Sequence, residues 1–302
     1  MKTRRRFLTI AAAAIALPSA GSTTGIHTWQ GTALGARATI RLDHPDARAI
    51  TARVAAEIDR LEDIFSLYRP DSALSRLNAA SGLALPPFEL LECLSIADAA
   101  HAVTEGRFDP TIQNLWKNHA DAGASGIRLG SDVLADLASR TGWDKVRFDA
   151  DAITLRPGMA LTLNGIAQGY IADRVAAMLV AEGLDRILID TGEFRALGGR
   201  PEGGGWPVRL AAGGSVSLSD RALATSAPLG TTFDREGRLS HIVDPRSGRP
   251  SDTGLKEITV TGPSAAMADA FTTAACLMPS RDAIERCLVR LPELTLQSAK
   301  FA

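Results

Sequence analysis

The strongest periodic pattern in the sequence lies between residues 47 and 65, ARAITARVAAEIDRLEDIF. Its apolar residues recur at intervals of three and four, at Ile50, Val54, Ile58, Leu61 and Ile64. This spacing predicts an amphipathic helix with one buried face. A helix of this kind must lay its apolar face on another layer of the protein.

Segments around this helix alternate between helical and strand-like patterns. Residues 31–43 predict a turn and then a strand with Ala36, Ala38, Ile40 and Leu42 on one face. Pro70 and Asp71 precede a short helix, and a further helix ends at Gly106. We expect a loop over RFDPTIQNLW (residues 107–116), followed by a glycine-rich linker to about residue 130.

The second half of the chain reads mainly as strands. We expect strands over residues 143–165, a helix over 166–184 and a strand over 186–199, which together form a strand–helix–strand unit. Short strands follow to Ile242, and Ser264 is a good N-cap for a last helix. Because the strands and helices do not alternate regularly, the fold class is α+β with mixed, largely antiparallel sheets flanked by helices.

The N-terminus, MKTRRRFLTIAAAAIALPSA, has a basic start, an apolar run and then small residues. These features are typical of a signal peptide, and the apolar run is too short for a transmembrane helix. The letters TRRRFL match the twin-arginine export pattern, and the alternative is a Sec signal with an additional arginine. We expect a twin-arginine signal peptide over residues 1–20, one domain over residues 26–302, a periplasmic location and no stable membrane insertion.

The formal net charge of -1 gives no general attraction for nucleic acid or for an anionic membrane. Three cysteines, Cys93, Cys276 and Cys287, form no CxxC motif. At most one disulfide is possible, and we expect buried free thiols.

Residues 265–278, AAMADAFTTAACLM, contain one charge, Asp269, among apolar neighbours. A buried carboxylate is costly unless it is paired or bound to a metal. On a helix, Asp269 and Thr273 share one face, and two hard oxygen atoms so placed suit Mg²⁺. The alternatives are a carboxylate that caps a neighbouring turn and an exposed residue on the polar side of the helix.

Glycines bracket a turn in LTLNGIAQGYIAD, where Gly165 and Gly169 precede a predicted helix. Glycine lets the backbone approach a ligand closely, and amides at a helix N-terminus favour phosphate. The segment lacks the Lys-Ser/Thr ending of a P-loop, and its GxxxG spacing alone is not specific.

The segment SHIVDPRSGRP places His241 at the end of a predicted strand, with Asp244 in a turn that brings Arg246 nearby. A histidine beside a carboxylate and an arginine can act as an acid or base next to an anion clamp. A single histidine also commonly has only a structural role. Similarly, FDPT at residues 108–111 is either a ligand loop or an Asp-Pro turn.

Taken in order, these segments resemble the ApbE-type FAD:protein FMN transferases, a family of periplasmic flavin transferases. The resemblance runs from about Thr28 to Met278 and rests on GTALGARATI, FSLYRPDSALSRLN, RFDPTIQNLW, LNGIAQGYIAD, DTGEFRALGG, ATSAP with HIVDPRSGRP, and ADAFTTAACLM. It implies a T-fold-like α+β fold, with one FAD site between two closely packed lobes.

The resemblance also implies a reaction and a set of residues. FAD is split at its pyrophosphate, AMP leaves, and FMN is joined by a phosphoester to a Thr or Ser hydroxyl of a target protein, with the assistance of Mg²⁺. The implied metal ligands are Gly165 through its carbonyl, Asp269, Thr272 and Thr273, and the implied catalytic residues are His241 and Asp269. The implied FAD contacts are Leu34, Tyr68, Arg107, Phe108, Asp109, Thr162, Gln168, His241 and Arg246.

The sequence departs from the family pattern at Leu34 in place of Met, at Ala36 in place of Thr and in ATSAP, which lacks a glycine. It also has Thr162 in place of Asp and Gln168 in place of Lys or Glu. The last two changes remove charges of opposite sign from one segment, and we interpret them as a compensating subfamily trait. The alternatives are a non-catalytic FAD-binding or flavin-delivery protein and a hydrolase that converts FAD to FMN and AMP. Related variants accompany periplasmic electron-transfer systems such as nitrous-oxide respiration, so the expected partners are FAD and a target protein of such a system.

Overall fold

The computed structural model describes residues 14–16, 26–211 and 213–302. The expected signal peptide lies outside the described residues except for positions 14–16. The helices are α1 (Ala47–Phe65), α2 (Ala73–Ala80), α3 (Phe88–Val103), α4 (Gln113–Ala124), α5 (Ser131–Ser139), α6 (Ala167–Ala181), α7 (Ala265–Ala275) and α8 (Arg281–Leu288). The strands are β1 (Ala14–Ala16), β2 (His27–Ala33), β3 (Ala36–Leu42), β4 (Gly82–Ala84), β5 (Arg147–Phe148), β6 (Ala152–Thr154), β7 (Ile187–Asp190), β8 (Phe194–Leu197), β9 (Trp206–Leu210), β10 (Ser215–Leu218), β11 (Ala222–Ser226), β12 (Leu255–Gly262) and β13 (Thr295–Phe301).

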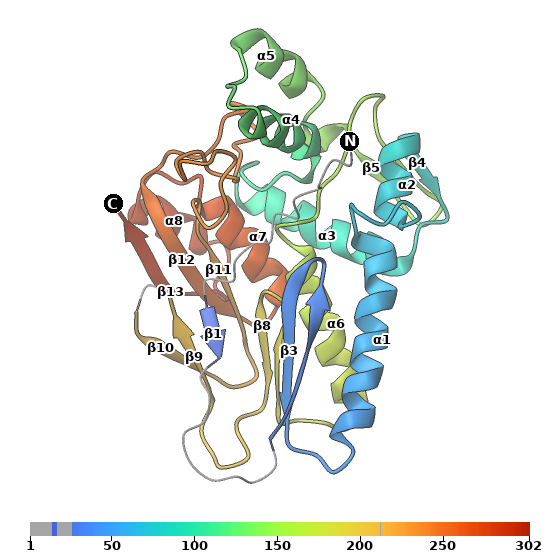
Figure 1. The fold of residues 1–302 in the computed structure, drawn as a ribbon, viewed down its shortest axis with the longest axis vertical. Coiled ribbons are helices and arrows are strands. Elements are labelled where there is room, and N and C mark those ends of the chain that lie inside the picture. The colour runs from blue at the N-terminus through green and yellow to red at the C-terminus, as the bar shows by residue number, and fades with distance from the viewer. Residues whose placement is uncertain (1–13, 17–25, 212) are drawn as a thin grey trace.

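A seven-stranded sheet of order β13-β12-β11-β8-β7-β3-β2 forms the centre of the fold (Figure 1). Every neighbouring pair in it is antiparallel. Two three-stranded sheets accompany it, one of order β1-β9-β10 and one of order β4-β6-β5. This arrangement confirms the predicted α+β class with largely antiparallel sheets flanked by helices.

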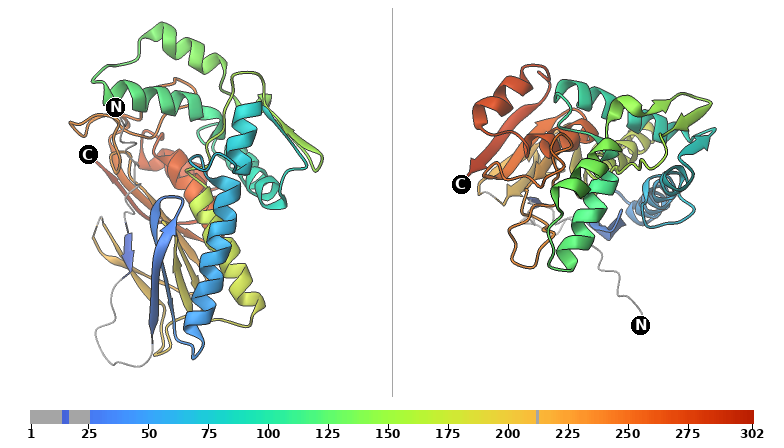
Figure 2. Two further views of the ribbon diagram at one scale, coloured as in Figure 1. Left: turned by 45° about the vertical axis from the view of Figure 1, so that its right-hand side comes forward. Right: turned by 90° about the horizontal axis from the view of Figure 1, so that it is seen from above.

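The middle of the central sheet is buried on both faces, whereas its edge strands β2 and β13 are partly exposed. Helices α1, α6 and α7 lie along one face, and β9 and β10 cover part of the other (Figures 1 and 2). In β7, Ile187 and Ile189 join the core on the helix side, whereas Leu188 joins the core beneath β9. The alternation of side chains along a strand therefore explains why β7 is apolar throughout.

The two most periodic predictions are confirmed. Helix α1 spans Ala47–Phe65 and buries the predicted apolar stripe, and β3 buries alternate residues beginning at Ala36. Helix α7 begins after Ser264, whose side chain accepts a hydrogen bond from the backbone N–H of Met267 at 3.2 Å. Local patterns were sufficient in these cases because each element presents one uninterrupted apolar face.

The predicted glycine-rich linker is wrong, because α4 occupies much of it. Leu115, His119 and Gly123 are spaced four apart and form the buried face of this helix. A Cβ atom at Gly123 would lie 2.3 Å from the carbonyl oxygen of Phe233. The glycine thus permits close packing of the helix against a distant loop, and it does not interrupt the helix.

The predicted order of short strands, a helix and a strand is found as β5, β6, α6 and β7, but these do not form one unit, because β6 and β7 belong to different sheets. Residues 158–163, just before α6, form no strand. The side chain of Asn78 donates to the carbonyl of Leu161 at 2.8 Å and accepts from its N–H at 2.7 Å. The amide of Asn78 thus satisfies the backbone hydrogen bonds that a neighbouring strand would otherwise make. After α6, the predicted single strand is the hairpin β7–β8.

Two smaller boundaries differ from expectation. Helix α3 ends at Val103, and Gly106 lies in the turn that follows, where it has a positive φ of 74°. The segment around His241 forms only isolated bridges, between Thr232 and Ser240 and between Val243 and Pro250.

The three cysteines are free, as predicted; Cys93 and Cys276 are buried and Cys287 is half-buried. Within the described ranges, none of the helices combines the length and apolar character needed to span a membrane.

Candidate active site

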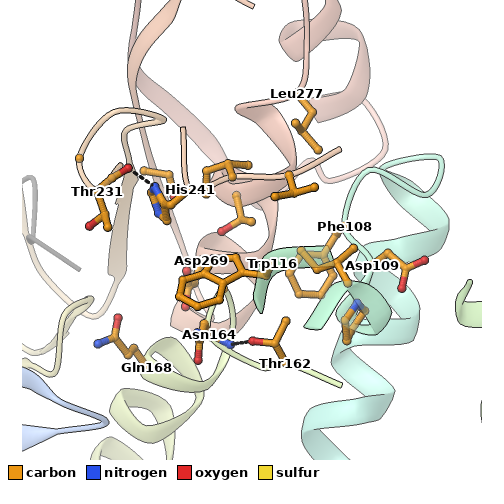
Figure 3. A pocket seen from close by; sticks show the side chains of 18 of the residues that line it. Phe108, Asp109, Trp116, Thr162, Asn164, Gln168, Thr231, His241, Asp269 and Leu277 are labelled. Carbon is orange, nitrogen blue, oxygen red and sulfur yellow. Dashed lines mark hydrogen bonds between the residues drawn. The ribbon is translucent and has the colours of Figure 1, made fainter. Parts of the chain in front are cut away.

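One cavity collects most of the predicted site residues. Its walls come from α7, the segment that leads into α6 and the loop before α4 (Figure 3). The turn before β8, the end of β11 and the loop after β11 complete them. The predicted residues that line it are Tyr68, Arg107, Phe108, Asp109, Thr162, Gly165, Gln168, His241, Asp269 and Thr273. Leu34, Arg246 and Thr272 are absent from this lining.

The position of α7 is fixed by α6. The carboxylate of Asp173 on α6 accepts hydrogen bonds from the N–H groups of Ala265 and Ala266 and from the hydroxyl of Ser264. These bonds satisfy amides at the start of α7. Gly169 permits the close approach of the two helices, because a Cβ atom there would lie 2.3 Å from the carbonyl oxygen of Ala265.

Asp269 lies in this helix contact with its carboxylate at the cavity wall (Figure 3). Only 4% of the residue is exposed, and Oδ2 accepts a long hydrogen bond of 3.4 Å from the N–H of Gly169. Burial raises the pKa of Asp269 to about 7. The residue is therefore not the exposed aspartate that we considered, whereas its bond to an N–H in the first turn of α6 is a contact of the capping kind that we considered as the other alternative.

A second buried carboxylate, Glu193, lines the same cavity and was not among the predicted site residues. Its Oε2 accepts a hydrogen bond from the N–H of Thr225 at 3.1 Å. Burial raises its pKa well above the usual value, and the charge of Asp269 raises it further. The segment around β7 and β8 also contains the buried carboxylate of Asp190, so the sequence did not single out Glu193 in the way that it singled out Asp269.

Gly165 lies directly over Thr273. A Cβ atom at Gly165 would be 2.8 Å from Oγ1 of Thr273, so a larger residue would displace this loop or the hydroxyl. The arrangement brings the backbone around Gly165 to the face of α7 that carries Asp269 and Thr273. The predicted combination of these three residues is thus realised in space.

Thr272 is directed elsewhere, in contrast to the expectation that it is a metal ligand. Its hydroxyl donates to the carbonyl of Asp269 at 3.0 Å and accepts from the hydroxyl of Ser226 at 2.9 Å. The residue is fully buried and its oxygen already has two partners. It ties α7 to β11 and does not line the cavity.

Leu34 and Arg246 also lie outside the cavity lining. Leu34 occupies the turn between β2 and β3 with a φ of 49°, and its N–H donates to Oε1 of Glu62 at 2.7 Å. Arg246 is half exposed and forms an ion pair of 2.6 Å with Asp244. The guanidinium group of Arg246, which we expected to bind an anion of the ligand, is therefore paired with the carboxylate of Asp244.

His241 is buried at the cavity and its tautomer follows from its contacts. Nδ1 lies 2.9 Å from the carbonyl oxygen of Thr231 and 3.2 Å from that of Pro228 (Figure 3). Carbonyl oxygens only accept, so Nδ1 carries the proton and Nε2 of the neutral ring is an acceptor. Burial lowers the pKa of His241 below its usual value, which favours this neutral form.

The loop before α4 supplies Phe108 and Asp109. The carboxylate of Asp109 accepts hydrogen bonds from the N–H and hydroxyl of Thr111 and from the N–H of Trp143. These partners hold the loop together, so the turn interpretation of FDPT describes this carboxylate correctly. Phe108 is buried, and Tyr68 is half exposed at the cavity.

Two of the positions that depart from the family pattern lie at the cavity, one in the segment before α6 and one in the first turn of α6. Thr162 and Gln168 line the cavity and are almost fully buried. The amide of Gln168 presses against Gly192, where a Cβ atom would lie 2.7 Å from its Cδ. This wall of the cavity is therefore neutral, as the sequence predicted.

The donor set fits Mg²⁺. Asp269 and Glu193 form no ion pair within the described part of the chain, although both are buried. The same part of the chain holds no cluster of three His, Cys, Asp or Glu residues suited to a metal. Two carboxylates with a hydroxyl and a carbonyl nearby match an ion that uses few protein ligands and keeps positions for water and substrate phosphate.

A neutral histidine, two uncompensated carboxylates and a glycine-rich helix start around one cavity define a site for a phosphate-bearing ligand and a divalent cation. The sequence matches the family model described as the ApbE family over residues 34–294. The chain belongs to the ApbE family, which confirms the predicted resemblance.

Relatives extend over most of the chain. An FAD:protein FMN transferase of Klebsiella pneumoniae is 30% identical over 270 residues, which cover 82% of this chain and 81% of that protein. An FAD:protein FMN transferase of Chlamydia pneumoniae is 30% identical over 240 residues, which cover 74% of this chain and 75% of that protein. The apo structure of the Pseudomonas stutzeri flavinyl transferase ApbE superposes with a TM-score of 0.78 and 26% identity, covering 90% of each chain.

Proposed function

We propose that this protein transfers FMN from FAD to a Thr or Ser hydroxyl of a target protein and releases AMP. The relatives named FAD:protein FMN transferase support the activity, since they match most of the chain. The observation that carries the proposal is the combination in one cavity of neutral His241 with the buried carboxylates of Asp269 and Glu193.

The reaction replaces the phosphoanhydride bond of FAD with a phosphoester bond to the acceptor. The acceptor oxygen forms a bond to the phosphorus of the FMN half, and the bond from that phosphorus to the bridging oxygen breaks. The bridging oxygen leaves with AMP, and the hydroxyl proton passes to Nε2 of His241. Because Nδ1 of His241 donates to backbone carbonyls, the ring is held with its acceptor nitrogen free for this proton.

Mg²⁺ would be held by Asp269, Thr273 and the carbonyl of Gly165, and it would neutralise charge on the diphosphate. Asp269 is presented for this role by the contact between α6 and α7. Phe108 and Tyr68 offer aromatic surface for the flavin or adenine ring, and the adjacent Arg107 offers charge for phosphate.

The same proposal includes the location. The twin-arginine pattern at residues 3–8 supports export of the folded protein to the periplasm, and a periplasmic electron-transfer protein is then the expected target. The neutral wall formed by Thr162 and Gln168 supports assignment to a subgroup, for which the nitrous-oxide-respiration variants are our candidate.

The test is a transfer assay with purified components. The protein is mixed with FAD, Mg²⁺ and the purified acceptor protein of an ApbE relative, and flavin fluorescence on a denaturing gel reports covalent transfer. We expect one AMP released for each flavin attached. AMP and free FMN without labelled acceptor would instead assign the chain as an FAD hydrolase, and tight FAD binding without AMP would assign it as a flavin-binding protein.

A further inference from the structure

A second hollow lies beside the active-site cavity, between the turn after α3 and helix α8. It is lined by Glu105, Arg107, Met278, Arg286, Cys287 and Arg290, together with Ala283. Arg107 also lines the active-site cavity, so this residue borders both spaces. Whatever occupies the hollow is therefore close to the proposed FAD site.

The hollow has an excess of positive charge. Three arginines contribute to it, against the single carboxylate of Glu105. Glu105 pairs with Arg290 at 2.6 Å and with Arg107 at 3.3 Å. Arg286 forms no ion pair with any residue that the structure describes. The local excess contrasts with the formal charge of -1 for the whole chain.

Two of these arginines are held in place by the backbone. Arg107 donates from Nη1 to the carbonyl of Thr104 at 3.1 Å, and Arg290 donates from Nη1 to the carbonyl of Val103 at 3.2 Å. The Nε atom of Arg107 is buried and has no hydrogen-bond partner. Because backbone contacts already hold the guanidinium groups of Arg107 and Arg290, these groups lose little further freedom when they bind an anion.

We propose that this hollow binds a phosphate monoester dianion, and that its occupant is the AMP produced when FAD is cleaved. The inference rests on the proposed function for the source of AMP. Each phosphate of FAD is esterified on both sides and carries one charge, whereas the phosphate of AMP carries close to two at neutral pH. Converging guanidinium groups therefore favour the product over the substrate.

Arg107 gives this preference a role in the reaction. Cleavage at the bridging oxygen creates the second charge on the phosphate of AMP, on a molecule that already occupies the cavity bordered by Arg107. The arginines of the hollow then draw the phosphate away from the site of transfer. The hollow acts as an exit site for the product.

The test measures binding of AMP to protein already loaded with FAD, in EDTA so that FAD stays intact. Flavin fluorescence polarisation establishes saturation with FAD, and calorimetry follows AMP. We expect AMP to bind without displacing FAD, adenosine not to bind, and the affinity for AMP to fall as salt is raised. In the double variant Arg286→Ala/Arg290→Ala we expect at least a tenfold loss of AMP affinity with FAD binding unchanged.

The matched control is Arg281→Ala on the same helix, where an exposed arginine pairs with Glu285 outside the hollow. It should keep wild-type affinity for AMP. The inference is overturned if AMP binds only by displacing FAD, or if the double variant binds AMP as the wild type does. A wild-type protein that fails in the transfer assay contradicts the proposed function, whereas normal transfer without this second binding event contradicts only the exit site.

Discussion

The carboxylate of Asp269 on α7 and that of Glu193 in the turn before β8 are buried at one cavity and repel each other. Each accepts a hydrogen bond from one backbone N–H, Asp269 from Gly169 and Glu193 from Thr225. Within the described residues, no lysine or arginine pairs with either acid. Because two uncompensated buried carboxylates oppose folding, a cation at this site would stabilise the protein as well as assist the reaction.

Glu193→Gln should stabilise the metal-free protein. Glutamine keeps the shape and an acceptor oxygen for the N–H of Thr225, but removes the repulsion with Asp269. We expect the melting temperature in EDTA to rise by several degrees, which corresponds to about 1–2 kcal/mol for a chain of this size. The rise in melting temperature that Mg²⁺ produces should be smaller in Glu193→Gln than in the wild type. Thermal unfolding with and without Mg²⁺ measures both effects.

The control for this change is Glu285→Gln, which removes an exposed carboxylate paired with Arg281. It should alter the unfolding free energy by less than about 0.5 kcal/mol, with no dependence on Mg²⁺. A lower melting temperature for Glu193→Gln in EDTA would show that the charge of Glu193 is stabilising, contrary to our account.

Asp269 should make the stability of the metal-free protein depend on pH. Its pKa is about 7 in the folded state, compared with an ordinary 3.8, so the folded state holds a proton that the unfolded state releases. The unfolding free energy should therefore fall as the pH rises from about 4 to about 7 and then level off. Urea unfolding in EDTA at several pH values, compared with Asp269→Asn, isolates the contribution of this group. If the unfolding free energy falls equally with pH in the wild type and in Asp269→Asn, Asp269 is not the cause of the pH dependence.

The sequence predicted those parts of the site that depend on one element at a time. Asp269 and Thr273 were found because both lie on one helix, and Ser264 marked where that helix begins. Glu193 was missed as a site residue because its importance comes from Asp269, which is distant in the chain. Thr272 was assigned to the metal because its bond to Ser226 depends on how α7 meets β11. Asp109 was assigned to FAD from the family resemblance and does line the cavity, but its bond to Trp143 could not be seen without the fold.

His241→Asn should greatly slow transfer and leave FAD binding nearly intact. Asparagine can still donate to the carbonyl oxygens of Thr231 and Pro228, but it lacks an acceptor at the position of Nε2. Loss of a general base typically lowers a rate by about 10²–10⁴-fold. Initial rates of acceptor labelling at saturating FAD measure this loss.

The pH profile tests the same residue independently of the size of that loss. Burial lowers the pKa of His241 below its usual value, so the ring is already neutral at pH 7. The wild-type rate should be insensitive to His241 above pH 7 and should fall only at more acidic pH, as the ring gains a proton. The residual activity of His241→Asn should lack this acidic decline. A variant that keeps the decline would assign it to another group.

Gly165→Ala tests the close approach of the loop to α7. The added Cβ would lie 2.8 Å from Oγ1 of Thr273, so the loop or the hydroxyl must move. Crowding of this kind costs about 1–3 kcal/mol, and movement of either oxygen should weaken Mg²⁺ binding at least tenfold. Gly130→Ala, where a Cβ meets nothing within 4 Å, is the matched control and should change neither property. Titration with Mn²⁺ followed by electron paramagnetic resonance reports the affinity without requiring activity. If Gly165→Ala binds the metal as the wild type does, the backbone at this position does not contribute to the metal site.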